Sequence, residues 1–114
     1  DRHASVRELA QRFACVVVLK GAGSLVGAAD GRVATCPFGN PGMASAGMGD
    51  VLTGVIAGFI AQGLEAWDAA CAGVVLHARA GDRAAGASPR GLLAGDLFLP
   101  LRDLSNGAGD DVVV

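Results

Sequence analysis

A glycine-rich stretch, GNPGMASAGMGDVLTG from Gly39 to Gly54, holds the residues of this sequence that are best suited to chemistry. It leads directly into an apolar run that begins at Val51. The first backbone N–H groups of a helix have no partner within the helix, and together they carry about half a positive charge. Glycines before a helix let an anion approach these groups closely. The segment Ala46–Gly49 therefore predicts an anion cradle, although glycine-rich loops also serve simply as turns.

The carboxylate of Asp50 stands at the junction between this loop and the helix. No Lys-Ser/Thr pair follows the last glycine, as a Walker A loop requires, and there is no G-x-G-x-x-G spacing after a strand. A carboxylate would repel a phosphate that was merely bound there. It would instead accept the proton of a hydroxyl that attacks the phosphate, while adjacent amides stabilise the transferring group. The alternative is structural, because Asp is also favoured at helix N-termini.

Lys20 ends the apolar run CVVVLK and is the second candidate for ligand binding. The run is continuous, which is typical of a strand that is covered on both faces in a parallel sheet. Sheets of α/β proteins bind ligands at the carboxyl ends of their strands, which is where Lys20 lies. The alternative is a solvated lysine at a strand end.

An α/β arrangement must position these candidates. The segment SVRELAQRF predicts an amphipathic helix, and Asp30-Gly31 between two short apolar runs predicts a hairpin with a type I′ turn. Gly54 and Gly58, one helical turn apart, predict the close approach of another backbone. The other predicted elements are strands at Ser24–Ala28 and Arg32–Cys36, an anion loop at 39–50, helices at 51–62, at 65 or 66 to about 85 and in AGDLFLPLRDL, and a loosely held tail at 105–114.

Composition narrows the class of protein. The chain has 114 residues, enough for about one small domain, and 52% of them are hydrophobic. A net charge of -2 without a Lys/Arg cluster argues against nucleic acid or an anionic membrane as a partner. Cys15, Cys36 and Cys71 are odd in number and widely spaced, which indicates a reducing cytoplasm rather than a disulfide or zinc site. The start at Asp1, in helix-like sequence, predicts a fragment of a longer protein.

The glycine-rich stretch with its following helix, GNPGMASAGMGDVLTGVIAGFIAQG, closely resembles the signature of the ADP/ATP-dependent NAD(P)H-hydrate dehydratases. The segments VVLKGAGSLV, LHARAGDRAAG and GLLAGDL resemble weaker landmarks of the same family, so that the resemblance covers roughly Val16 to Leu97. It implies a ribokinase-like layered sheet with flanking helices, of which residues 1–114 would form a single C-terminal portion. It also implies a homo-oligomer.

The resemblance implies a reaction and assigns roles. Hydrated NADH or NADPH (NADHX or NADPHX) would be phosphorylated on its ring hydroxyl by ADP or ATP, with Mg²⁺, and phosphate would then be eliminated. Asp50 would contact this substrate and act as the base. The anion hole would be Gly47, Met48 and Gly49; nucleotide binding would fall to Lys20, Gly21, Ala22, Gly23, Ser24 and again Gly49. No residue is predicted to ligate a metal.

Two residues depart from the family pattern, which usually reads Gly-Gly-Thr/Ser-Gly-Asp. Ala46 removes backbone freedom, and Met48 removes a hydroxyl that could contact phosphate. Two other functions remain open: a small-molecule kinase of the same fold, which leaves the phosphate on a sugar or vitamin precursor, and a nucleotide-binding module without activity. Residues outside the motif are predicted to be structural: His77 as a packed, hydrogen-bonded residue, Trp67 as packing, Met43 with Met48 as loop packing, and Asp82, Asp96 and Asp103 as caps or surface charges.

Overall fold

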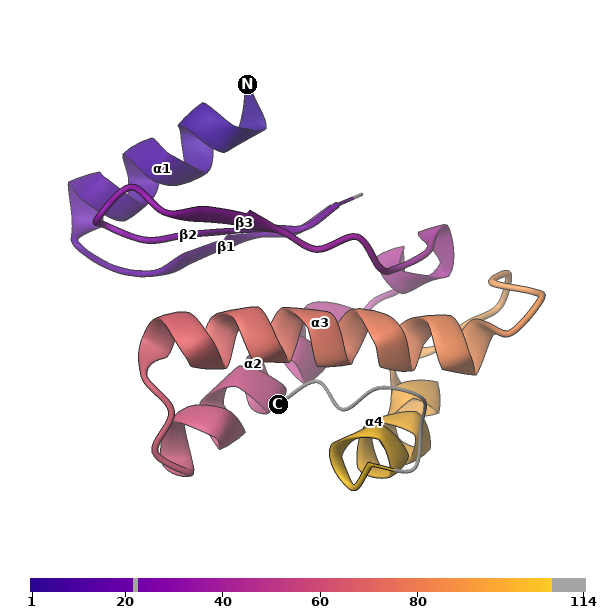
Figure 1. Cartoon of the computed structure of the whole chain (residues 1–114). Helices are drawn as coiled ribbons and strands as arrows, with labels where there is room; N and C mark the ends of the chain where they lie inside the picture. The colour runs from indigo at the N-terminus through magenta and orange to yellow at the C-terminus, as the bar shows by residue number, and fades with distance from the viewer. Residues whose placement is uncertain (22, 108–114) are drawn as a thin grey trace.

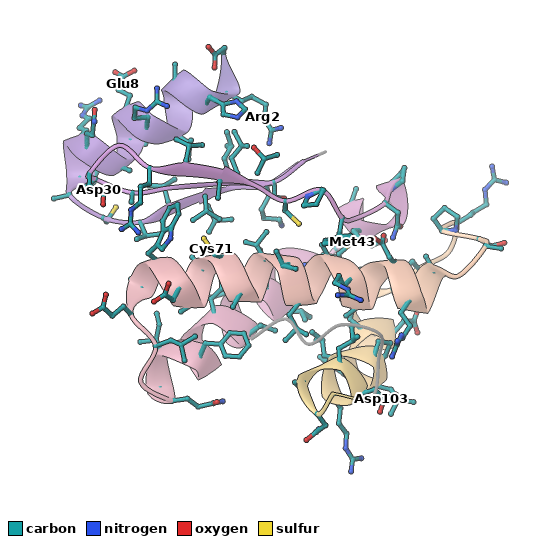
Figure 2. The ribbon with its side chains drawn as sticks, in the orientation of Figure 1. Arg2, Glu8, Asp30, Met43, Cys71 and Asp103 are labelled. Atoms are coloured by element: carbon teal, nitrogen blue, oxygen red, sulfur yellow. The ribbon has the colours of Figure 1, made fainter. Side chains whose placement is uncertain are left out.

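A computed structural model describes residues 1–21 and 23–107 as three layers (Figure 1). Helix α1 (Arg2–Phe13) covers one face of a small sheet, and helices α2 (Met48–Ala61) and α3 (Ala66–Ala85) lie on the other side, with α4 (Phe98–Ser105) beneath α3. Cys71 of α3 points toward the sheet, where it packs against the core between the two layers (Figure 2). The predicted α/β class is confirmed. The predicted tail falls mostly on residues 108–114, outside the described part of the chain.

The sheet is antiparallel throughout its three described strands, in the order β1 (Val17–Leu19), β2 (Leu25–Gly27), β3 (Val33–Thr35). The parallel neighbour expected for the Cys15–Lys20 strand is therefore wrong for this part of the chain. The reason is the short connection after β1, because a parallel partner needs a crossover of about a dozen residues or more. β2 is the central, fully buried strand, whereas β1 is half-buried.

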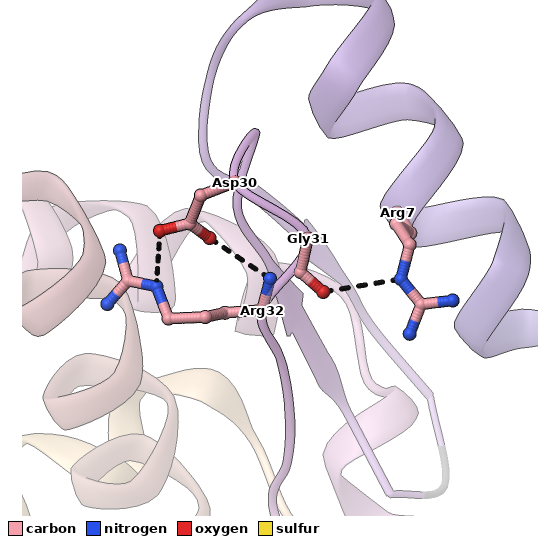
Figure 3. Close-up of polar contacts among 4 residues, drawn as sticks. All are labelled: Arg7, Asp30, Gly31 and Arg32. Carbon is pink, nitrogen blue, oxygen red and sulfur yellow. Dashed lines mark hydrogen bonds and ion pairs between the residues drawn. The ribbon is translucent and has the colours of Figure 1, made fainter.

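The hairpin between β2 and β3 turns at the predicted Asp30-Gly31, but by a different turn type (Figure 3). The Gly31 N–H donates to the Ala28 carbonyl over 3.0 Å, and Gly31 has a φ of +98° while Asp30 has no positive φ. This is a three-residue loop with a glycine bulge, not a type I′ turn. The Asp30 carboxylate also bridges the turn, since it accepts from the Arg32 N–H at 3.0 Å and from Arg32 Nε at 2.7 Å.

Two glycines let neighbouring elements of the fold pack closely. A Cβ on Gly27 of β2 would lie 3.0 Å from Cγ2 of Val6, which is completely buried in α1. A Cβ on Gly73 of α3 would lie 2.6 Å from Cγ1 of Ile56 in α2. The close approach predicted at Gly54 and Gly58 is wrong, since an added Cβ there would meet nothing within 4 Å. The glycine that admits the neighbouring helix is on α3, not on α2.

Two short 3₁₀ helices complete the described chain: η1 (Pro41–Ala44) in the glycine-rich stretch and η2 (Ala94–Leu97) before α4. The helix predicted at 51–62 begins three residues earlier, at Met48. This shift matters for function, because it moves the last residues of the glycine-rich loop into the first turn of α2.

Candidate functional site

The first turn of α2 contains the residues predicted to form the anion cradle. Gly47 caps the helix with a φ of +86°, and its carbonyl accepts the first helical hydrogen bond from the Val51 N–H at 3.1 Å. Gly49 and Asp50 thus occupy the second and third helical positions, whose N–H groups have no acceptor in the helix itself. The side chain of Asp50 is exposed. This geometry suits the approach of an anion to the positive end of α2.

Lys20 lies directly against this turn. A Cβ on Gly49 would be only 2.6 Å from Lys20 Nζ, so the ammonium group sits where any larger residue would project. Lys20 follows β1 immediately, and the antiparallel return to β2 leaves its exposed side chain at the end of the sheet. The structure therefore brings together two sequence-predicted groups that are 29 residues apart (49 minus 20). An ammonium beside a helix N-terminus attracts a phosphate from two directions.

Arg2, which no sequence pattern pointed to, binds the backbone on either side of Ala22. Its guanidinium donates to the carbonyls of Leu19, Lys20 and Gly23 at 3.3 to 3.4 Å. Ser24 Oγ donates to the Gly21 carbonyl at 3.2 Å, so that the predicted nucleotide-binding segment is tied internally as well. Ala22, also predicted to bind nucleotide, lies outside the described residues. Arg2 carries no sequence signal, because it resembles any other charged residue on a helix surface.

A pocket of about 700 Å³ opens beside Lys20, between the end of the hairpin, the glycine-rich loop and α3. Its lining includes Lys20, Gly21, Gly23 and Ser24 of the predicted nucleotide segment. The rest of the lining comes from the strand β3 end and the loop, and from the helices facing them: Thr35, Cys36, Pro37, Phe38, Gly39, Asn40, Pro41, Met43, Ala44, Ser45, Leu52, Val74, His77 and Ala78. Gly47, Met48, Gly49 and Asp50 are not among the lining residues, and Lys20 connects the two groups.

The side chain of Met48 points away from the anion site. It is 1% exposed and packs in a core cluster with Leu76, Ala80 and Leu97. The backbone of Met48 is already bonded within the protein, because its N–H donates to the Ser45 carbonyl at 3.3 Å and its carbonyl lies 3.0 Å from His77 Nε2. A hydroxyl at this position would be directed into the core, so the departure from the family pattern removes no contact with an anion in this arrangement.

His77 connects α3 to the same turn. Its ring is buried, and Nε2 lies 3.0 Å from the Met48 carbonyl; since a carbonyl only accepts, Nε2 carries the proton. Burial lowers the pKa of His77, the Met48 carbonyl acts in the opposite direction, and the charge of Lys20 lowers the pKa further. A neutral, hydrogen-bonded core histidine confirms the predicted packing role.

Asp82, predicted to be a cap or a surface charge, instead holds the start of the glycine-rich loop. Its two oxygens accept from the Gly39 N–H and from Asn40 Nδ2, both at 2.9 Å. The Asn40 Oδ1 in turn accepts from the Gly42 N–H at 3.0 Å. The prediction for Asp96 as a cap is confirmed, since its carboxylate accepts from the Leu93 N–H at the start of η2.

The family model described as NAD(P)H-hydrate dehydratase matches residues 1–101. The chain belongs to this family. Among curated relatives, the bifunctional NAD(P)H-hydrate repair enzyme Nnr of Vibrio cholerae is 55% identical over 108 residues, which cover 93% of this chain and 22% of that protein. The ADP-dependent (S)-NAD(P)H-hydrate dehydratase of Neisseria meningitidis is 43% identical over 108 residues, covering 93% of this chain and 36% of its own length.

Solved structures agree with this assignment. The ADP/ATP-dependent NAD(P)H-hydrate dehydratase of Bacillus subtilis, co-crystallised with ATP/Mg²⁺, superposes with a TM-score of 0.88 at 28% sequence identity, over 96% of this chain and 40% of that one. The chain thus has the fold of part of the dehydratase domain and spans well under half the length of these relatives. Within the described residues, no helix is long and apolar enough to cross a membrane.

Proposed function

We propose that the protein carrying this chain is an ADP- or ATP-dependent NAD(P)H-hydrate dehydratase. The observation that carries the proposal is the juxtaposition of Lys20 Nζ with Gly49 at the start of α2. It joins the pocket lined by Lys20, Gly21, Gly23 and Ser24 to the turn that bears Asp50. A nucleotide in the pocket would then present its terminal phosphate to the ammonium and to the helix amides together.

In this proposal Asp50 is the base. The ring hydroxyl of hydrated NAD(P)H attacks the terminal phosphorus of the nucleotide, and the exposed Asp50 carboxylate accepts the hydroxyl proton. The amides of Gly47, Met48 and Gly49 would stabilise the charge on the phosphoryl group as it transfers, and the Met48 N–H would give up its 3.3 Å hydrogen bond to the Ser45 carbonyl to do so. Phosphate then leaves with the electrons of its C–O bond, and loss of a ring proton restores the double bond of NADH or NADPH. AMP or ADP is the other product.

The nucleotide would be ADP or ATP bound along Lys20, Gly21, Ala22, Gly23 and Ser24. Mg²⁺ usually keeps several waters and binds through phosphates with one or two carboxylates, rather than inside a cage of protein ligands. In this proposal the ion would be held mainly by the phosphates of the nucleotide and by water. When bound, the ion would neutralise part of the phosphate charge.

The test uses the full-length protein with hydrated NADH and either ADP or ATP. Recovery of the reduced-cofactor absorbance is expected, and its failure beside an active repair enzyme would sink the assignment. Asp50→Asn should abolish turnover and leave nucleotide affinity nearly unchanged, whereas undiminished turnover would exclude the base role. Product analysis tests the kinase alternative, because a stable phosphoester would replace free phosphate.

We also infer a cytoplasmic, homo-oligomeric protein. The three free cysteines suit a reducing compartment. Leu93, Phe98 and Leu99 are each about two-thirds exposed around η2 and α4, an apolar surface that supports packing against further protein. Light scattering of the full-length protein measures its mass; a monomer would refute the oligomer.

A further inference from the structure

Helix α3 contacts the glycine-rich loop at its beginning, its middle and its end. Asp82 accepts hydrogen bonds from Gly39 and Asn40, where the loop starts. His77, just over one turn earlier on the helix, donates to the Met48 carbonyl, where the loop becomes α2. These three hydrogen bonds thus hold both ends of one loop from a single helix.

The middle of the loop rests on the same face. A Cβ on Gly81 would overlap the sulfur of Met43, so this glycine leaves just enough room for the methionine of η1. Figure 2 shows the Met43 side chain where the η1 segment meets α3. Side chains three to four residues apart lie on one side of a helix, which is why His77 and Gly81 act together, with Asp82 beside them. The segment HARAGD from His77 to Asp82 therefore forms the surface on which the loop packs, and this packing is called the seating of the loop below.

We infer that His77, Gly81 and Asp82 are positioning residues that fix the loop on α3, and through it the Gly49 and Asp50 amides relative to Lys20. Glycines give a loop many conformations, so an anion cradle made from one must be held by other groups. Neither His77 nor Asp82 has to touch the reacting atoms for this role. The catalytic consequence rests on the dehydratase function proposed above, whereas the seating of the loop does not.

The experiment compares four variants of the full-length protein. Asp82→Asn removes one acceptor for the loop, and Asp68→Asn makes the same change on an exposed residue in the first turn of α3, as the matched control. His77→Leu removes the donor to Met48, and His77→Gln supplies an amide N–H in place of Nε2–H. Hydrogen exchange of the amides of residues 39–51 is measured without substrate, then kcat and the Kd for ADP.

We expect Asp82→Asn and His77→Leu to speed exchange of the loop amides about tenfold, as for loss of one hydrogen bond near a charged or buried group. kcat should fall roughly 10- to 100-fold, the scale of a misplaced catalytic group, with a change in ADP Kd of less than about threefold. His77→Gln should restore kcat to within about threefold of wild type, and Asp68→Asn should match wild type.

Unchanged loop exchange in Asp82→Asn and His77→Leu would overturn the inference, as would a His77→Gln variant as impaired as His77→Leu. If His77→Leu fails to fold, the comparison of Asp82→Asn with Asp68→Asn decides alone. A wild-type protein without dehydratase activity would refute the proposed function, and the exchange rates would still test the seating.

Discussion

Gly49→Ala separates folding from ligand binding at the start of α2. Gly49 lies in the helix without a positive φ, so alanine fits its backbone and gains about 0.5–1 kcal/mol of helix propensity. The new Cβ would be 2.6 Å from Lys20 Nζ, well inside contact distance, so the ammonium must move by roughly 1 Å. Because Lys20 is a long, exposed side chain, it can move at little cost to folding. We expect a stability equal to or slightly above that of wild type.

Nucleotide binding should weaken instead. A hydrogen bond between a charged donor and phosphate contributes about 1.5–3 kcal/mol, so displacing the ammonium should raise the Kd for ADP roughly 10- to 150-fold. Calorimetry measures the Kd, and thermal unfolding measures the stability. Gly54→Ala is the matched control, because it makes the same change in the same helix with nothing within 4 Å of the new Cβ. Equal ADP affinities in the two variants would refute the role given to Lys20. A Gly49→Ala protein less stable than wild type would refute the argument that the Lys20 side chain can move away from the new Cβ at little cost to folding.

Three further predictions concern the groups that support the site. Met48→Ala should lower the free energy of unfolding by about 2–5 kcal/mol, as for a buried side chain, in urea denaturation; an undiminished stability would contradict its burial. Gly27→Ala should lower the free energy of unfolding by about 1–3 kcal/mol, because its new Cβ would clash with Val6. Gly31→Ala is the comparison in the same urea measurement, since its Cβ would meet nothing within 4 Å and only its positive φ is unfavourable. For His77 the folded pKa lies below the ordinary 6.5, so the unfolded chain binds protons more readily and stability falls as pH drops below about 6.5. His77→Gln should remove this part of the pH dependence, and an identical slope in both proteins would exclude it.

Local sequence patterns predicted most elements of the fold. Glycine and proline between short apolar runs predicted the positions of β2, β3 and the helices. This worked because turns and amphipathic faces are determined by residues close together in the sequence. The prediction of a parallel neighbour for β1 was wrong for the described strands, because an apolar run indicates only that a strand is buried. Burial does not specify the direction of the adjacent strand. The start of α2 was placed too late, at Val51, since Met48 and Gly49 look like loop when read without their partners.

The supporting residues of the site were beyond such patterns. Arg2 reaches carbonyls 17 to 21 residues away, and Asp82 reaches Gly39 across 43 residues. A charged residue on a helix gives no local sign of which distant backbone it will bind. Composition and spacing could identify the loop and Lys20, but only the packing of α1 and α3 identifies the residues that hold them in place.

The same loop shows why residue type must be interpreted together with side-chain direction. Met48 looked like the residue most able to impair an anion site, yet its side chain is buried and its backbone alone faces the helix start. Gly49 was expected to bind through its backbone, and it is also the position where a side chain would meet Lys20. Consecutive helical residues point about 100° apart, so one can enter the core while the next faces the ligand. Substitutions at residue 48 should therefore change stability according to how well the new side chain fills the core. Substitutions at residue 49 should mainly change the affinity for the nucleotide.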